Sequence, residues 1–336
     1  CLLVSGGSEG MDAAIRIARQ HHVAAGRTNR WKTIGRTISY HGATLATLLA
    51  SNHDRRRATL EPLLTEQPKA DALDIEAVTK LVEAEDPDTV AAIVVEPVSG
   101  ASGGAIVAPD NYLPGLRQLC TDYDIVLIAD EVMTAFGRTG ARFGVDHAGI
   151  VPDILVGGKG LGGGYVPIGG VYARPELIAP IAEAGLTVMY YTFTGNDVSC
   201  AVANRVLQIL IEEHLVERAA VMGQKLASLL AEALGDHRHV ADIRGRGLMQ
   251  GLELVRDRET GRGFGGQLTP RVVAEALARD CWIYPAGSGP VPDALLFGPP
   301  LTIAESELER LVAITVEAID AAVAQMEPDA KAAMAR

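Results

Sequence analysis

Residues that could bind an anion gather near the start of the chain, where Ser5-Gly6-Gly7-Ser8-Glu9-Gly10 lies between an apolar segment and a helical pattern. Small residues let backbone N–H groups approach an anion closely, and the start of the following helix adds the positive end of its dipole. The segment therefore predicts a phosphate cup, with Ser8 offering its hydroxyl. The alternative is a plain helix cap, formed by a serine with acidic residues nearby. No Gly-Lys-Ser/Thr follows, so the segment is not a P-loop.

Two adjacent acids, Asp130 and Glu131, end the apolar run that begins at Val126. Strand alternation sends their side chains to opposite faces, and ligands of open α/β sheets bind at the carboxyl ends of strands. A buried acid there needs a cationic partner, and a protonated pyridine nitrogen would serve. A magnesium-binding acid is the alternative, which the missing P-loop disfavours.

Lys159 differs in setting from the other five lysines, because it follows the apolar run Ile154–Val156 and sits inside a cluster of glycines. A lysine that loses hydration has a lowered pKa, and its free amine becomes available as a nucleophile. The surrounding glycines leave room for a flat ring and a tight turn. The alternative is a surface lysine in a glycine-rich loop.

Histidines give weaker signals. His41, between Tyr40 and Gly42, could stack beside an aromatic cofactor. The spacing of the other histidines suggests no metal site. Four of them are expected on solvated surface: His21, His22, His237 and His239.

The elements that must position these residues alternate between short Val- and Ile-rich runs and amphipathic stretches, which indicates a mostly parallel α/β sheet. The sequence itself suggests five or six strands. The expected strands are Thr33–Tyr40, Val90–Val95, Ile125–Ala129, Ile154–Val156 and Ile168–Tyr172. The expected helices between them are Met11–Gln20, Leu73–Val82 and Pro114–Tyr123.

The pattern changes after about residue 200, where long helices precede a β-like segment rich in glycine. We expect a large domain over residues 1–205, followed by a linking helix and a small α+β domain over residues 206–336. The expected elements of this half are helices in Cys200–Leu234, β structure in Arg244–Leu254, a helix at Pro270–Arg279, a strand at Cys281–Tyr284 and a last helix at Ser306–Ala324.

Composition excludes several classes of function. The 336 residues carry a net charge of -12, which argues against nucleic acid and anionic membrane surfaces as partners. The one basic run, Arg55-Arg56-Arg57, is expected to be a solvated loop. Four scattered cysteines without a CxxC pair fit a cytoplasmic protein. The chain begins at a cysteine and runs straight into an apolar segment, so we expect N-terminal sequence to be missing.

Together, the phosphate cup, the acid and the lysine, in this order, resemble the class-III aminotransferases, which are fold-type-I enzymes dependent on pyridoxal 5'-phosphate (PLP). The resemblance covers essentially the whole chain. The matching motifs are Ser5–Glu9, Tyr40–Gly42, Glu96-Pro97-Val98, Asp130-Glu131-Val132, Phe136–Gly140, Lys159–Gly164, Thr192–Asn196, Arg244–Leu248 and Gly298–Leu301.

The resemblance implies a large domain with a mostly parallel seven-stranded sheet, a small C-terminal α+β domain, and a homodimer with shared active sites. It implies that Lys159 forms the Schiff base and moves the proton, and that Asp130 pairs with the pyridinium nitrogen. The remaining cofactor residues it implies are Tyr40 and Val132 on the two ring faces, His41 beside the ring, Glu96 in the polar network, Gly7 and Ser8 at the phosphate, and Thr192 reaching the partner subunit's phosphate.

The implied reaction is ping-pong transfer of an amino group from an amine or ω-amino acid to a 2-oxo acid. Many relatives hold a substrate carboxylate with an arginine at the position that Leu296 appears to occupy. We therefore expect acceptors with a single carboxylate, such as pyruvate. Decarboxylation, racemisation or aminomutation on the same scaffold, or an inactive truncated relative, remain the alternatives.

Overall fold

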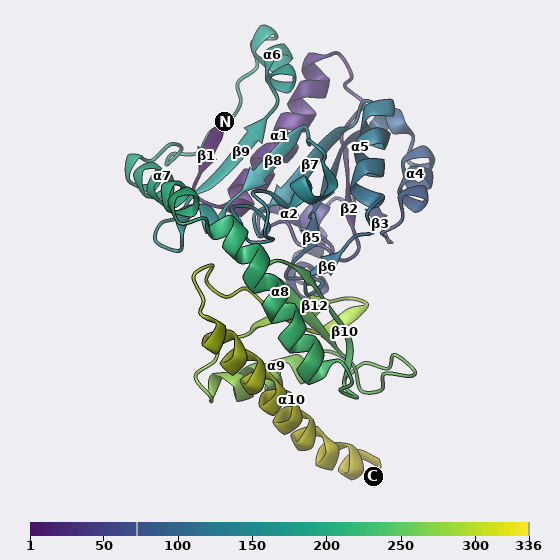
Figure 1. Cartoon of the computed structure of the whole chain (residues 1–336). Helices are drawn as coiled ribbons and strands as arrows, with labels where there is room; N and C mark the ends of the chain where they lie inside the picture. The colour runs from purple at the N-terminus through teal and green to yellow at the C-terminus, as the bar shows by residue number, and fades with distance from the viewer. Residues whose placement is uncertain (72, 335–336) are drawn as a thin grey trace.

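The computed structural model describes residues 1–71 and 73–334 of the chain, which form a large and a small lobe (Figure 1). The large lobe is built on a seven-stranded sheet with the order β1-β9-β8-β7-β4-β2-β3. Its central strands pair in parallel, whereas β9 pairs antiparallel with both β1 and β8. The strands are β1 (Leu2–Val4), β2 (Lys32–Arg36), β3 (Lys69–Ala70), β4 (Val90–Val95), β7 (Val126–Glu131), β8 (Ile154–Gly157) and β9 (Gly169–Ala173).

Helices flank this sheet because each turns an apolar stripe toward it. In α1 (Gly7–Ala24), Met11, Ala14 and Ile17 are buried in one cluster with side chains of β4, β7 and β8. The second face is covered by α4 (Ile75–Ala84) and α5 (Tyr112–Asp122), whose buried residues cluster with Ile93 and Leu127. The other helices of this lobe are α2 (Leu45–Ala50), α3 (Asp54–Arg57), α6 (Pro175–Glu183) and α7 (Asp197–Glu212).

The helix α8 (Leu215–Leu234) leads into the small lobe (Figure 1), which packs helices against an antiparallel sheet. The sheet has the order β10-β11-β13-β12 and shares one hydrophobic cluster with α8, α9 and α10. The remaining elements of this lobe are β10 (Val240–Arg246), β11 (Met249–Leu254), α9 (Leu268–Leu277), β12 (Tyr284–Ser288), β13 (Val291–Phe297) and α10 (Glu305–Met334). A separate hairpin of β5 (Val98–Ser99) and β6 (Ile106–Val107) lies between β4 and α5 in the sequence.

The α/β architecture and the mostly parallel seven-stranded sheet agree with the predictions, but some details were wrong. The strand expected at Cys281–Tyr284 begins only at Tyr284, and the sheet has more strands than the five or six visible in the sequence. His22 and His239 are buried rather than solvated. The predicted division at residues 205 and 206 falls within α7 and stays a prediction. No helix in the described residues is long and apolar enough to cross a bilayer.

Candidate active site

The end of β7 carries the first predicted site residue, Asp130, which is only 5% exposed. His41 lies against it, with Nδ1 2.8 Å from Oδ2, and the backbone N–H of Val132 donates to Oδ1 at 3.1 Å. Since an ionised carboxylate only accepts hydrogen bonds, His41 Nδ1 carries the hydrogen in this pair. The second ring nitrogen, Nε2, is buried and has no hydrogen-bond partner in the described structure. Asp130 is thus held in a fixed orientation by His41 and the backbone.

Glu131 points to the opposite face of the strand, as alternation predicts. Its carboxylate is fully buried and accepts hydrogen bonds from the N–H groups of Gly144 and Val145, both at 2.8 Å, and from the Thr134 hydroxyl. Burial raises the pKa of Glu131, while these three donors act in the other direction. This acid holds the following turn in place.

Lys159 comes directly after β8, the strand that pairs with β7, so strand register brings it to the same edge of the sheet as Asp130. Lys159 is exposed to solvent, but many protein atoms surround its side chain. The resulting desolvation lowers the pKa of Lys159. The negative charges of Asp130 and Glu96 act in the opposite direction. The structure therefore places an amine of increased nucleophilic availability beside a buried carboxylate.

Glu96 lies at the end of the neighbouring strand β4 and is also buried. It accepts hydrogen bonds from the N–H groups of Gly100 at 3.0 Å and Tyr40 at 3.3 Å. Desolvation is the main cause that raises its pKa, and nearby His41 lowers it. Through its hydrogen bond with the Tyr40 N–H, Glu96 connects the end of β4 with the segment that contains Tyr40 and His41.

The start of α1 faces this group of residues. Gly6 caps the helix without a side-chain hydrogen bond, so the alternative of a serine cap is not formed and the first-turn N–H groups are left for an anion. The Ser8 hydroxyl accepts the N–H of Ala43 at 3.1 Å. Gly7 is required by close packing, since a Cβ there would lie 2.6 Å from Val132 Cγ1. Gly7, Ser8 and Val132 are thus adjacent, beside Asp130.

Among the predicted site residues, Thr192 does not lie with the others. It is exposed on the loop before α7 and makes no side-chain hydrogen bond with the other predicted residues in the described part of the chain. Its neighbour Tyr191 fixes this loop to α1, because its hydroxyl lies 3.1 Å from Asp12 Oδ2 and 2.8 Å from Arg16 Nη2. Thr192 is therefore presented outward from an anchored loop.

The geometry also adds a residue that sequence reasoning missed. Arg56, expected in a solvated loop, lies in α3 with its Cζ 4.1 Å from the centre of the Tyr40 ring. Its charge helps to lower the pKa of Lys159. The only signal in the sequence was the position of the arginine run shortly after Tyr40-His41-Gly42.

Taken together, these residues fit a phosphorylated, flat, cationic ring. Uncapped N–H groups and the Ser8 hydroxyl suit a phosphate, buried Asp130 suits a ring nitrogen that carries a proton, and Lys159 suits an aldehyde carbon. The described residues contain no cluster of side chains suited to a metal ion.

Comparison with known proteins agrees with this chemistry. Residues 1–319 match the family model described as aminotransferase class-III. The chain is 31% identical to putrescine–pyruvate aminotransferase of Pseudomonas aeruginosa, over 94% of this chain and 72% of that protein. It is 35% identical to ornithine aminotransferase 1 of Staphylococcus aureus, over 93% of this chain and 73% of that protein.

Solved structures show the same fold. A Bacillus anthracis aminotransferase superposes with a TM-score of 0.91 at 30% identity, covering 95% of this chain and 75% of the other. An (S)-enantioselective omega-transaminase from Thermomicrobium roseum superposes with a TM-score of 0.87 at 33% identity, covering 97% of this chain and 75% of the other.

Proposed function

Because the chain belongs to the class-III aminotransferase family of PLP-dependent enzymes, we propose that Lys159 is its Schiff-base lysine and that Asp130 holds the proton on the cofactor's ring nitrogen. The observation that carries the proposal is the convergence of a lysine of lowered pKa and a buried carboxylate at adjacent strand ends, opposite an uncapped helix N-terminus. Gly7 and Ser8 would hold the phosphate, and Val132 and Tyr40 would pack on the two ring faces.

When bound, PLP supplies an electron sink for breaking a bond at the substrate carbon that carries the amine. Asp130 would keep the ring nitrogen protonated, and His41 holds the Asp130 carboxylate in orientation through its 2.8 Å contact. The amine of Lys159 would act as the acid-base group for the proton of the substrate carbon. Glu96 accepts the Tyr40 N–H and so would hold Tyr40 in place for the cofactor ring.

The test of the site is chemical labelling. After borohydride reduction of the PLP-loaded enzyme, peptide mapping should find the phosphopyridoxyl group on Lys159. In Lys159→Ala, turnover should be lost while PLP still binds non-covalently. A label on any other lysine, including Lys69, whose pKa is also lowered, to about 8, would overturn the assignment.

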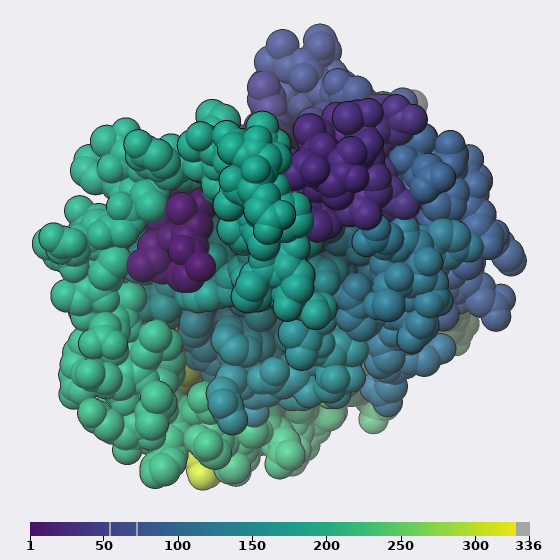
Figure 2. Space-filling view, turned by 90° about the horizontal axis from the view of Figure 1, so that it is seen from above, coloured from purple at the N-terminus to yellow at the C-terminus, as the bar shows by residue number. Residues whose placement is uncertain are grey.

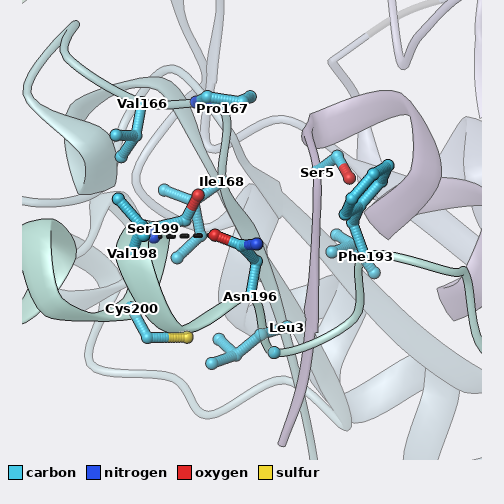
Figure 3. Close-up of a pocket in the computed structure, with 12 residues that line it drawn as sticks. Leu3, Ser5, Val166, Pro167, Ile168, Phe193, Asn196, Val198, Ser199 and Cys200 are labelled. Atoms are coloured by element: carbon cyan, nitrogen blue, oxygen red, sulfur yellow. Dashed lines mark hydrogen bonds between the residues drawn. The ribbon is translucent and has the colours of Figure 1, made fainter.

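We further propose a homodimer in which Thr192 serves the partner's phosphate. An apolar cavity of about 430 Å³ opens beside β1 and the start of α7, and Leu3, Ile168 and Phe193 line it (Figure 3). The N-terminal segment lies at the surface there, next to residues from the α7 region (Figure 2). Several apolar side chains in the neighbouring segments are more than half exposed, namely Tyr165, Met189, Tyr190, Phe193 and Val198. Such exposure suits an obligate interface with a second copy.

Sedimentation of the PLP-loaded enzyme tests the dimer. A dimer at the concentrations used for activity is expected, and an active, PLP-loaded monomer would rule out shared sites. Thr192→Val should weaken PLP binding without changing the sedimentation coefficient.

For substrates, we propose an amine or ω-amino acid as donor and a 2-oxo acid with one carboxylate as acceptor. The amine and pyruvate in the name of the Pseudomonas aeruginosa relative support this pairing. In the described structure Leu296 is buried in the β13 strand, and an unpaired second carboxylate would be desolvated at a cost. A tenfold preference for 2-oxoglutarate over pyruvate in kcat/KM would overturn this proposal.

The protein is also proposed to act in the cytoplasm. All four cysteines are free, and Cys120 and Cys200 are at least partly buried without a disulfide partner, which suits a reducing compartment. Cell fractionation with thiol labelling would test this.

A further inference from the structure

Arg56 places a positive charge next to Tyr40. Its guanidinium carbon lies 4.1 Å from the centre of the Tyr40 ring, a distance typical of a cation–π contact. Tyr40 is itself tied to Glu96 through its N–H. The charge of Arg56 is near enough to Lys159 to act on its amine. Arg56 therefore lies beside Tyr40, the residue proposed to pack on the cofactor ring, and within electrostatic range of Lys159.

Arg56 is exposed and forms no ion pair with any carboxylate whose side chain the structure describes. The next residue, Arg57, behaves differently: it pairs with Glu61 at 3.1 Å and donates to the carbonyls of Leu48 and Ser51. Within one short helix, Arg57 is held by a carboxylate and two carbonyls, whereas Arg56 contacts the Tyr40 ring and no described carboxylate.

The three arginines inside the motifs Phe136–Gly140 and Arg244–Leu248 contact carbonyl or carboxylate groups of the chain, most weakly Arg246, whose only partner among the described residues is 3.5 Å away and exposed. The contacts are those of Arg138 with the carbonyls of Leu248 and Pro299, Arg244 with the carbonyls of Gly103 and Gly104 and with Asp242 and Glu253, and Arg246 with Asp110.

We propose that Arg56 binds the carboxylate of the 2-oxo acid acceptor and so selects acceptors with a single carboxylate; this rests on the proposed function. A guanidinium matches the two oxygens of one carboxylate. The buried acids of the site, Asp130 and Glu96, add negative charge nearby, which disfavours a second carboxylate. The acceptor cation is thus supplied by α3 rather than by the strand that carries Leu296.

The experiment compares two acceptors in the half-reaction of the amino-loaded enzyme, followed by absorbance. Pyruvate carries the carboxylate, whereas acetaldehyde is pyruvate without it. In Arg56→Gln, kcat/KM for pyruvate should fall about 30-fold, mainly through KM, because a charge-assisted pair is lost. The value for acetaldehyde should stay within threefold. Arg56→Lys should recover part of the loss with pyruvate.

Arg55→Gln is the matched control, since it removes the same charge from the same helix at a residue whose guanidinium lies toward Gly266. It should leave both acceptors within threefold of the unmodified enzyme. Equal losses with pyruvate and acetaldehyde in Arg56→Gln would show that Arg56 only supports Tyr40 and would overturn the proposal, as would an unchanged value for pyruvate. An unmodified enzyme that transfers its amino group to neither acceptor would overturn the proposed function itself.

Discussion

Asp130 and Glu131 are chemically alike and adjacent, yet the two faces of β7 give them different tasks. Glu131 is fully buried and accepts hydrogen bonds from three donors of the chain. Asp130 has two protein partners, His41 and the Val132 N–H, and lies with Lys159 at the edge of the sheet. A buried acid whose hydrogen bonds are all taken by the chain supports the fold, whereas one that keeps a side open toward a ligand can do chemistry.

The largest expected effect is that of Asp130→Asn. Its amide cannot hold a proton on the ring nitrogen by charge, so kcat should fall by about a thousandfold or more, equivalent to roughly 4 kcal/mol. The measurement is turnover with one donor and one acceptor at saturating PLP. A value within tenfold of the unmodified enzyme would remove Asp130 from the mechanism.

Glu131→Gln should show the opposite profile. Its amide group replaces one acceptor oxygen and meets a buried donor, which should lower the free energy of unfolding by about 2 kcal/mol. The kcat of the folded fraction should stay within threefold. Urea denaturation of both variants, followed by circular dichroism, separates the two acids. The comparison fails if Glu131→Gln loses as much kcat as Asp130→Asn.

His41→Phe tests how much the fixed orientation of the Asp130 carboxylate contributes to kcat. The change removes the donor to Asp130 Oδ2 and keeps a ring in the buried space. We expect kcat to fall about tenfold, the amount that one hydrogen bond to a charged group can supply. The absorbance maximum of bound PLP should shift in parallel, because the environment of the ring nitrogen changes.

Thr134→Val is the matched control, since it removes one donor to Glu131. It should lower the free energy of unfolding by about 1 kcal/mol and leave both kcat and the PLP spectrum unchanged. A loss of kcat equal to that of His41→Phe would mean that the two faces of β7 are coupled.

The sequence predicted the features that depend on local pattern. Short Val- and Ile-rich runs such as Val90–Val95 became buried parallel strands, and residues after such runs met at one edge of the sheet, because parallel strands share their carboxyl ends. The order of cup, acid and lysine was therefore enough to assemble most of the candidate site.

Features that depend on distant packing could not be predicted. His22 is buried because its Nε2 lies 2.9 Å from the carbonyl of Ala91 in β4, and nothing in its neighbourhood in the sequence indicates this. The strand β12 contains a proline and a glycine and forms at a sheet edge by pairing with β13. Arg56 reaches Tyr40 only because the chain after α2 folds back.

The backbone at Lys159 has a φ of 39°, a left-handed conformation that suits glycine better than a residue with a side chain. Its neighbours Gly157, Gly158 and Gly160 could each occupy such a conformation at less cost. Selection for a stable apoenzyme alone would favour glycine at residue 159 as well. Lysine at this position therefore lowers the free energy of unfolding, by about 1 kcal/mol. It supplies an amine that the glycines of the turn lack.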